Sequence, residues 1–435
     1  MLKRKAFQDL LDWKKYNRKK ALLVTGARQV GKTFLVREFA KQHYEVFAEV
    51  NLLENAQAKK VLSEAVDSED LLLRLSSFLG VEFVPHKTLI FIDEVQESKE
   101  IVTAIKFLVE KYDYDFVLSG SLLGVELKDI KSWPVGYLRT IEMFPLDFQE
   151  FCWSQGVSSQ IEDLLKESLQ SQASIPDYIH ESMLRLFHKY LIVGGMPEVI
   201  NGFIETNNIE TVRRIQKDII VQHREDIAKY KSSEALNIKR IYDLIPGELN
   251  KQNKRFHFKS LVRNARFDRY ENNFLWLIEA GVVLPTYAVS DLTYPLLASQ
   301  SPSMFKLFLM DVGLLTNRLL GTSSAELLSK NSAVNYGSIY ENVVAQELRT
   351  KNLDLYYYNS KKYGELDFVV QATDNTIIPV EVKSGKGYRR HKALTNVLEV
   401  ENYDFSYGYV LCEDNVHVEG RVVYLPVYSS SYLEL

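Results

Sequence analysis

A glycine-bounded loop near the N-terminus has the spacing of a phosphate-binding site. Residues 26–33 read GARQVGKT and fit the pattern G-x-x-x-x-G-K-[ST] between an apolar run and an amphipathic helix. Glycines let backbone N–H groups turn toward phosphate oxygens, and the N-terminus of the following helix favours negative charge. Lys32 would reach the terminal phosphates, and the Thr33 hydroxyl would bind Mg²⁺. The expected nucleotide-binding residues are Gly26, Ala27, Arg28, Gln29, Val30, Gly31, Lys32, Thr33 and Phe34.

Two adjacent carboxylates follow a second apolar run. Residues 89–92 (LIFI) predict a buried strand, and Asp93 and Glu94 come directly after it. Ligands of open α/β sheets bind at the carboxyl ends of the strands. We therefore expect Asp93 in the Mg²⁺ shell and Glu94 beside the attacking water. The alternatives are a chance loop match and an acidic pair capping the next helix, but the order of the two motifs favours a nucleotide site.

Two further polar residues flank later strands of the same region. Ser119 ends the run FVLS and is a candidate contact for the γ-phosphate or the attacking water, although Ser-Gly-Ser is also ordinary turn chemistry. Arg139 stands at another predicted strand, in GYLRTIEMF. It could stabilise γ-phosphate charge, within one chain or across a subunit interface, or be an ordinary surface arginine.

A charged hairpin near the C-terminus forms a second candidate site. Residues 364–385 (GELDFVVQATDNTIIPVEVKSG) predict two strands joined by a turn. Alternation places Glu365 and Asp367 on one face of the first strand, and Glu381 with Lys383 on one face of the second. The opposite, apolar faces are expected to hold Leu366, Phe368 and Val370 on the first strand and Ile378, Val380 and Val382 on the second.

A glutamate on the preceding helix changes the interpretation of this hairpin. Glu341, in NYGSIYENVVAQELRTKN, falls between Val344, Ala345 and Leu348 on the apolar stripe, where an unpaired carboxylate is costly. Helix-Glu, strand-Asp and Glu-x-Lys is the arrangement of the PD-(D/E)XK nuclease fold, which binds Mg²⁺ through carboxylates. The expected metal ligands and catalytic groups are Glu341, Asp367, Glu381 and Lys383, with Glu365 supporting them. The alternative is an inactive module whose charges form ion pairs, such as Lys383 with Asp367.

The middle of the chain alternates helices and turns before a strand. Residues 268–280 predict a helix seated by Phe274, Leu275, Leu277 and Ile278, and GVVLPTYAV (281–289) supplies a strand that could form a wing. Lys251, Lys254, Arg255, Lys259, Arg263, Arg266 and Arg269 face one acid in this segment, Asp268. A basic helix-turn-helix surface indicates phosphate contact with DNA, whereas many winged helices dock proteins instead.

Several motifs together resemble one family. The phosphate loop, LIFIDEVQ, VLSGS and PLDFQEF resemble the prokaryotic AAA+-like ATPases that carry a C-terminal domain of uncertain function. VGGMPEVI (193–200) and LFLMDVGLL (307–315) are similar to that family too, without obvious chemistry. The resemblance implies ATP and Mg²⁺ as cofactors, an ATPase activity and a winged helix, with DNA or a protein as the partner.

Chain length, cysteine count and the lengths of apolar runs limit the possible domain organisation and cellular location. At 435 residues the chain is too long for one core. The expected fold class is α/β, with a P-loop (AAA+-like) parallel sheet in 1–157, a helical linker in 158–232, a winged helix in 233–318 and a small restriction-endonuclease-like α/β domain in 319–435. Cys152 and Cys412 are too few for a disulfide framework, and no apolar run has the roughly 18 residues of a membrane span, so we expect a cytoplasmic protein without membrane contact. The oligomeric state stays open.

Overall fold

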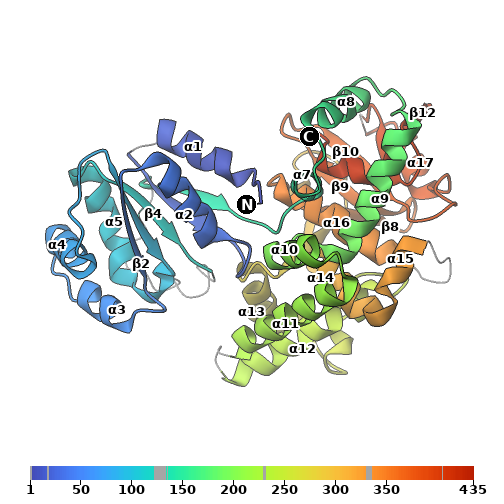
Figure 1. Ribbon diagram of the computed structural model, residues 1–435. Coiled ribbons are helices and arrows are strands. Elements are labelled where there is room, and N and C mark those ends of the chain that lie inside the picture. Colours follow the sequence, from blue (N-terminus) through green and yellow to red (C-terminus); the bar gives the residue numbers. More distant parts are fainter. Residues whose placement is uncertain are drawn as a thin grey trace. The chain divides into compact units, whose positions relative to one another are not determined.

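The computed structural model describes residues 2–16, 19–121, 134, 136–228, 232–329, 336–403 and 405–435 (Figure 1). These residues divide into two units. Unit 1 consists mainly of Lys3–Phe144, and unit 2 consists mainly of Pro145–Ile278 and Val282–Leu435. The expected division into four segments stays a prediction, since the contacts between residues resolve only these two units.

A parallel sheet forms the centre of unit 1. Its strands are β1 (Ala21–Thr25), β2 (Val46–Asn51), β3 (Thr88–Asp93), β4 (Asp115–Ser119) and β5 (Leu138–Glu142), in the order β2-β3-β4-β1-β5. Every neighbouring pair in it is parallel. The helices are α1 (Ala6–Tyr16), α2 (Lys32–His43), α3 (Ala56–Ser63), α4 (Ser68–Leu79), η1 (Val95–Glu97) and α5 (Lys99–Lys111). Because all strands run the same way, the ends of β1, β3 and β4 meet at one edge, as expected for the predicted nucleotide site.

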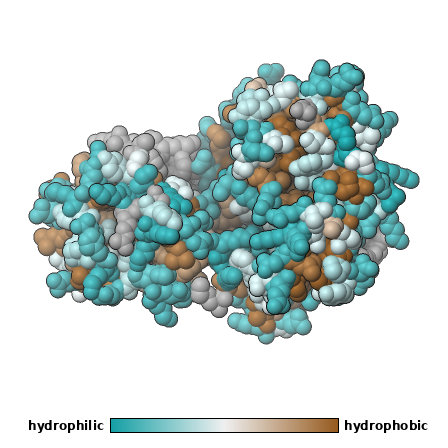
Figure 2. Space-filling view, turned by 90° about the horizontal axis from the view of Figure 1, so that it is seen from above, coloured by the Kyte–Doolittle hydropathy of each residue, from teal (hydrophilic) through white to brown (hydrophobic). Residues whose placement is uncertain are grey.

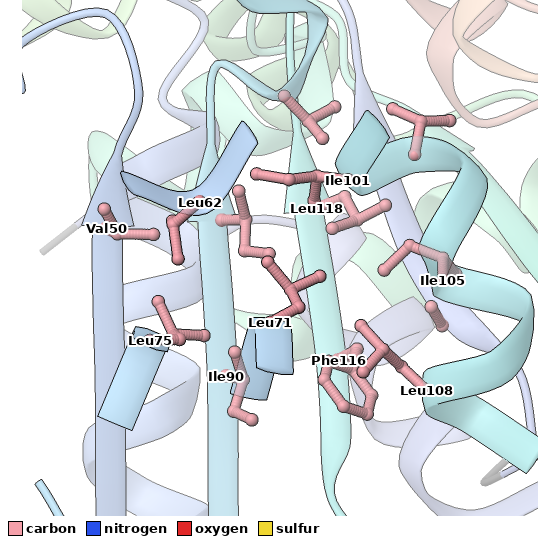
Figure 3. Packing of buried hydrophobic residues seen from close by; sticks show 14 of the residues in the cluster. Val50, Leu62, Leu71, Leu75, Ile90, Ile101, Ile105, Leu108, Phe116 and Leu118 are labelled. Carbon is pink, nitrogen blue, oxygen red and sulfur yellow. The ribbon is translucent and has the colours of Figure 1, made fainter. Parts of the chain in front are cut away.

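Apolar packing against helices α3, α4 and α5 holds one face of this sheet. Figure 3 shows Ile90 and Phe116 on the strands against Leu71 of α4 and Ile105 of α5. Alternate strand residues belong to this cluster, as the two-residue period of a strand requires. Helix α2 contacts β3 and β4, and Phe7 of α1 packs edge-on against Phe39 of α2. The sheet is thereby fixed firmly enough to position the loops at its edge.

Unit 2 contains most of the helices that the structure describes. They are α7 (Phe148–Ser154), α8 (Ser159–Gln170), α9 (Asp177–Val193), α10 (Pro197–Thr206), α11 (Ile209–Ala228), α12 (Ser232–Leu249), η2 (Phe258–Ser260), α13 (Phe267–Glu279), η3 (Leu296–Ser299), α14 (Val312–Leu320), η4 (Gly321–Ala325), α15 (Glu326–Ser329), α16 (Gly337–Thr350), α17 (Lys392–Leu398) and η5 (Val427–Ser431). The helix predicted over 268–280 is α13, in which Phe274 and Leu277 are buried as expected, whereas Leu275 is 38% exposed.

An eight-stranded mixed sheet runs through unit 2. Its strands are β6 (Val283–Val289), β7 (Gln300–Leu309), β8 (Tyr356–Ser360), β9 (Gly364–Gln371), β10 (Ile377–Val382), β11 (Gly408–Cys412), β12 (His417–Glu419) and β13 (Val422–Pro426), in the order β12-β13-β11-β10-β9-β8-β6-β7. Strand β6, expected to form a wing, pairs antiparallel with β7 and parallel with β8. The strand is therefore part of the sheet that also contains the C-terminal hairpin.

The motifs VGGMPEVI (193–200) and LFLMDVGLL (307–315) contact each other in the interior of unit 2. Asp311 accepts hydrogen bonds from the backbone N–H of Gly195 (2.6 Å) and of Leu314 (2.9 Å). A side chain on Gly194 would collide with the Asp311 carboxylate, and one on Gly313 would collide with the Val193 carbonyl. The glycines of VGGMPEVI and LFLMDVGLL are thus required for close backbone approach, which explains these motifs as packing elements.

No helix among the described residues is long and apolar enough to cross a membrane. Hydrophilic residues cover most of the face shown in Figure 2, and hydrophobic ones occur there in separate patches. Cys152 and Cys412 are both free and buried.

Candidate functional site

The loop between β1 and α2 has a backbone that only its own glycines allow. Gly26 has φ +126° and Gly31 has φ +95°, in the region that favours glycine. A side chain on Gly26 would collide with the backbone carbonyl of Met143. Helix α2 begins at Lys32 directly after Gly31, so its first N–H groups lie at the loop. This is the geometry required to wrap phosphate oxygens.

Lys32 lies inside this loop. Its Nζ donates to the carbonyl oxygens of Gly26 (3.0 Å) and Ala27 (2.8 Å), and the residue is only 6% exposed. Burial lowers the pKa of Lys32 to about 8, against the opposing charges of Glu94 and Asp93. A phosphate would give the ammonium group a full negative charge in place of two carbonyl dipoles, so the loop favours an anion here.

Asp93 collects hydrogen bonds from three elements at the sheet edge. Its Oδ2 accepts from Thr33 Oγ1 (2.9 Å) and Asn51 Nδ2 (3.1 Å), and its Oδ1 accepts from Ser119 Oγ. The Thr33 hydroxyl and the Asp93 carboxylate are hard oxygen donors already in contact, which is the donor set that Mg²⁺ prefers. These two residues therefore fit the predicted metal.

Glu94 lies beside this group in an unusual backbone conformation. It has φ +56° and ψ +49°, a left-handed geometry that is uncommon outside glycine and clusters at functional sites. Its Oε2 accepts from Gln96 Nε2 at 2.6 Å, and the Ser121 hydroxyl lies 3.5 Å away. Gln96 thus holds the carboxylate of the residue that directly follows Asp93, and we expect this carboxylate to activate water.

The other two candidates of this region have different surroundings. Ser119 is fully buried with its hydroxyl on Asp93, and Ser121 is the serine closer to Glu94. Arg139 pairs with Leu22 in the middle of β1, and its charge opposes the rise in pKa that burial causes at Asp9 of α1. The role of Arg139 as a γ-phosphate contact stays a prediction.

Sequence reasoning missed Asn51 and Gln96. Asn51 is the last residue of β2 and binds Asp93, and Gln96 is only 6% exposed and binds Glu94. The rule that pointed to Asp93, a polar side chain at the carboxyl end of a parallel strand, would also have selected Asn51. No comparable signal marks Gln96, which reaches Glu94 because of the turn at η1.

The predicted C-terminal set is only partly brought together. Glu341 lies on α16, is 2% exposed and binds Lys254 Nζ, while Asp367 Oδ2 accepts from the Val382 N–H at 2.9 Å. Lys383 Nζ lies 2.6 Å from Glu381 Oε1, so its ion pair is with Glu381 rather than with Asp367, the partner named in the alternative interpretation. Among the residues that the structure describes, no three His, Cys, Asp or Glu side chains are arranged to hold a metal.

Burial dominates the electrostatics of these carboxylates. It raises the pKa of Glu341, and it raises the pKa of Glu381 to about 8, with repulsion from Asp367 adding to both.

The expected alternation of the first hairpin strand is wrong in part. The antiparallel pairing of β9 with β10 is present, with Val370 opposite Ile378. The register between β8 and β9 shifts, however, so that Leu366 and Val369 belong to the same apolar cluster. A bulge of this kind inserts one residue and reverses the faces beyond it, so Leu366, Phe368 and Val370 do not form one face.

A parallel sheet of this order, with a glycine loop after β1 and an acidic pair after β3, defines a P-loop NTPase fold. The predicted α/β class, with this sheet, a helical middle and an α/β C-terminal part, is confirmed. Residues 18–152 match the family model described as an AAA domain. This match agrees with the class of nucleotide-binding ATPase that the motifs predict.

Other comparisons say less about function. Residues 184–326 and 336–429 each match a domain of unknown function, DUF8612 and DUF4143. Similar solved structures include a Walker-type ATPase of Pyrococcus abyssi (13% identity, TM-score 0.44, covering 73% of this chain and 96% of that one). AMPPCP-bound DnaA from Aquifex aeolicus is also similar (13% identity, TM-score 0.30, covering 64% of this chain and 90% of that one). The Aeropyrum pernix ORC1 protein in complex with DNA is similar as well (12% identity, TM-score 0.28, covering 74% of this chain and 93% of that one). No curated protein matches the chain.

Replacing Glu94 with glutamine tests its predicted role. We expect ATP turnover to fall by roughly 100-fold, because the amide keeps the shape of the side chain but cannot accept a proton from water. Nucleotide affinity should change little, since the phosphate loop is intact. Phosphate release measures the first quantity and titration with a fluorescent ATP analogue measures the second. Glu64→Gln, an exposed residue at the end of α3, is the control; unchanged turnover in Glu94→Gln would exclude the assignment.

Proposed function

We propose that this protein hydrolyses ATP at the P-loop and couples its nucleotide state to contact with DNA through unit 2. The observation that carries the ATPase part is the direct contact of Thr33 with Asp93, with Glu94 held next to it. Lys32 would bind the β- and γ-phosphates, and Glu94 would orient and deprotonate the attacking water. Mg²⁺, held by Thr33 and Asp93, would neutralise phosphate charge. Ser119 would act indirectly, by fixing Asp93.

The DNA part is supported by a smaller basic surface than the composition indicated. Of the seven cations of residues 251–269, Lys251 pairs with Glu248 and Lys254 pairs with Glu341. Four others are exposed around η2 and the start of α13: Lys259, Arg263, Arg266 and Arg269. Only Asp268 opposes them within this stretch. Exposed cations on one short segment are the chemistry that binds a phosphate backbone.

The double substitution Arg263→Ala with Arg266→Ala tests this surface. We expect weaker binding to duplex DNA at low salt and a salt slope reduced by about 2, because each phosphate contact contributes about 0.9 to that slope. Fluorescence anisotropy over a series of salt concentrations measures both. Lys60→Ala with Lys106→Ala removes two exposed charges from unit 1 and serves as the matched control. Equal salt slopes in the test and control variants would remove this segment from the proposal.

Coupling itself is tested by the ATPase rate with single-stranded, duplex and branched DNA. Stimulation by one of these forms, absent in Arg263→Ala/Arg266→Ala, is the expected result. A rate that no DNA changes, together with no DNA affinity at low salt, would contradict the DNA part and leave the ATPase part standing.

A second candidate is a nucleotide-gated regulatory or scaffold protein that recruits a protein partner. The observation that favours it is that Glu341, Glu365 and Glu381 all lie against lysine ammonium groups. Carboxylates paired in this way stabilise a fold without cutting a substrate. Slow turnover that DNA does not change would favour this candidate, whereas nicking of DNA with Mg²⁺ that Glu381→Ala abolishes would exclude it.

A further inference from the structure

A fully buried lysine lies among the carboxylates of the C-terminal hairpin. Lys306 comes from β7 and is 0% exposed. Its Nζ is 2.9 Å from Glu365 Oε1, 3.6 Å from Glu341 Oε2 and 3.9 Å from Asp367 Oδ1. It also lies 5.0 Å from the centre of the Tyr357 ring. One ammonium group therefore faces three carboxylates, from α16 and β9.

A second lysine completes the arrangement. Lys254 Nζ binds Glu341 Oε1, so both oxygens of this carboxylate face ammonium groups. The two lysines reach the cluster together, because Arg255 forms a β-bridge with Lys306 and the Phe256 N–H donates to Phe305 O at 2.9 Å. The segment after α12 is thus bound to the edge strand β7, and both present a cation to the same site.

The cost of burying Lys306 indicates that its charge is needed. An unpaired ammonium group in a protein interior is strongly unfavourable and would lose its proton. Carboxylate oxygens of Glu365, Glu341 and Asp367 lie 2.9, 3.6 and 3.9 Å from its Nζ and supply the pairing that a buried charge requires. The lysine is therefore charged, and the carboxylates are the reason.

Formal charges show what this means for a metal. The four carboxylates of Glu341, Glu365, Asp367 and Glu381 meet the ammonium groups of Lys254, Lys306 and Lys383, which leaves one net negative charge. A divalent ion added to this group would make it positive. The position between Glu341 and Asp367, which the nuclease-like arrangement reserves for Mg²⁺, already faces Lys306. The residues present therefore do not fit that metal.

We infer that Lys306 is a resident cation that takes the place of the divalent metal in this cluster, and that the hairpin is held together by it without a metal ion. The inference does not depend on the ATPase proposal, because all its groups lie in unit 2. It assigns Lys306, with Lys254, a role that the hairpin residues alone do not reveal. It also predicts that loss of this lysine opens a metal site.

The test compares Mn²⁺ binding by the full chain, without nucleotide, for wild type, Lys306→Ala and Lys306→Ala/Asp367→Asn. Lys306→Ala should unfold at lower temperature and regain stability as Mn²⁺ is added, with an affinity at least about tenfold tighter than wild type. The double variant should lose this response, because a ligand is missing. Lys306→Met fills the space without charge, so this variant should be destabilised and its unfolding temperature should not rise when Mn²⁺ is added.

Two results would overturn the inference. The first is a folded Lys306→Ala variant whose affinity for Mn²⁺ is no higher than that of wild type. The second needs only folded wild type: Mn²⁺ binding observed by electron paramagnetic resonance and lost in Asp367→Asn would show that the native cluster holds a metal. If Lys306→Ala does not fold, this second measurement decides the question. Mn²⁺ binding that is the same in wild type and in Asp367→Asn supports the resident cation. Comparison with Asp367→Asn separates this site from Mn²⁺ bound near Thr33.

Discussion

Replacing Lys32 with alanine is expected to reduce ATP turnover by at least about 100-fold, the size of effect seen when one preorganised charge-stabilising donor is lost. Lys32 is 6% exposed, and its ammonium group donates to two carbonyl oxygens of the loop, so the loop itself positions the charge. Alanine removes the positive charge that we expect to meet the terminal phosphates. Steady-state phosphate release at saturating ATP measures the effect.

Lys41→Ala is the matched control for this experiment. Lys41 lies on the same helix, α2, but is exposed, so its loss changes helix composition and net charge equally. Circular dichroism should show that both variants keep the fold, because alanine is compatible with helix α2 at both positions. Turnover in Lys32→Ala equal to that of Lys41→Ala would place hydrolysis outside this loop and overturn the ATPase assignment.

The nucleotide site could be predicted because its signals are local. The glycines of the loop, the apolar run before Asp93 and the helix after Thr33 are each coded within about ten residues, and parallel topology brings the strand ends together. Asn51 obeys the same logic and was accessible in principle. Gln96 could not be predicted, because its contact with Glu94 depends on the left-handed backbone of Glu94, which no sequence pattern indicates.

The C-terminal site shows where sequence reasoning fails. Helix and strand periods, together with the nuclease-like arrangement, select Glu341, Asp367, Glu381 and Lys383, and of these four Glu341 and Glu381 are buried. The cation that decides their chemistry comes from residue 306, on a strand that pairs with β6 rather than with the hairpin. Periodicity says nothing about which distant strand supplies a neighbour. The register shift between β8 and β9 has the same cause, since a bulge depends on the partner strand.

The family motifs of unit 2 give the other prediction with a large expected effect. Gly195→Ala should lower the free energy of unfolding of unit 2 by about 3 kcal/mol, the upper end for overpacking a rigid site. The new methyl group would collide with backbone atoms of Leu146, which cannot rotate away as a side chain can. It would also disturb two hydrogen bonds, Gly195 N to Asp311 Oδ2 (2.6 Å) and Leu146 N to Gly195 O (2.7 Å). Urea unfolding followed by tryptophan fluorescence measures the change.

Gly247→Ala supplies the control that separates collision from the general effect of losing a glycine. Gly247 lies in helix α12, is exposed, and has no atom within 4 Å of the position that a methyl group would take. Alanine there should stabilise the unit by about 0.5–1 kcal/mol, because it reduces the entropy of the unfolded chain without strain. Opposite signs for the same substitution at two glycines of one unit would establish that VGGMPEVI is retained for close backbone packing. A Gly195→Ala variant as stable as wild type would leave that motif without a structural explanation and reopen the search for its function.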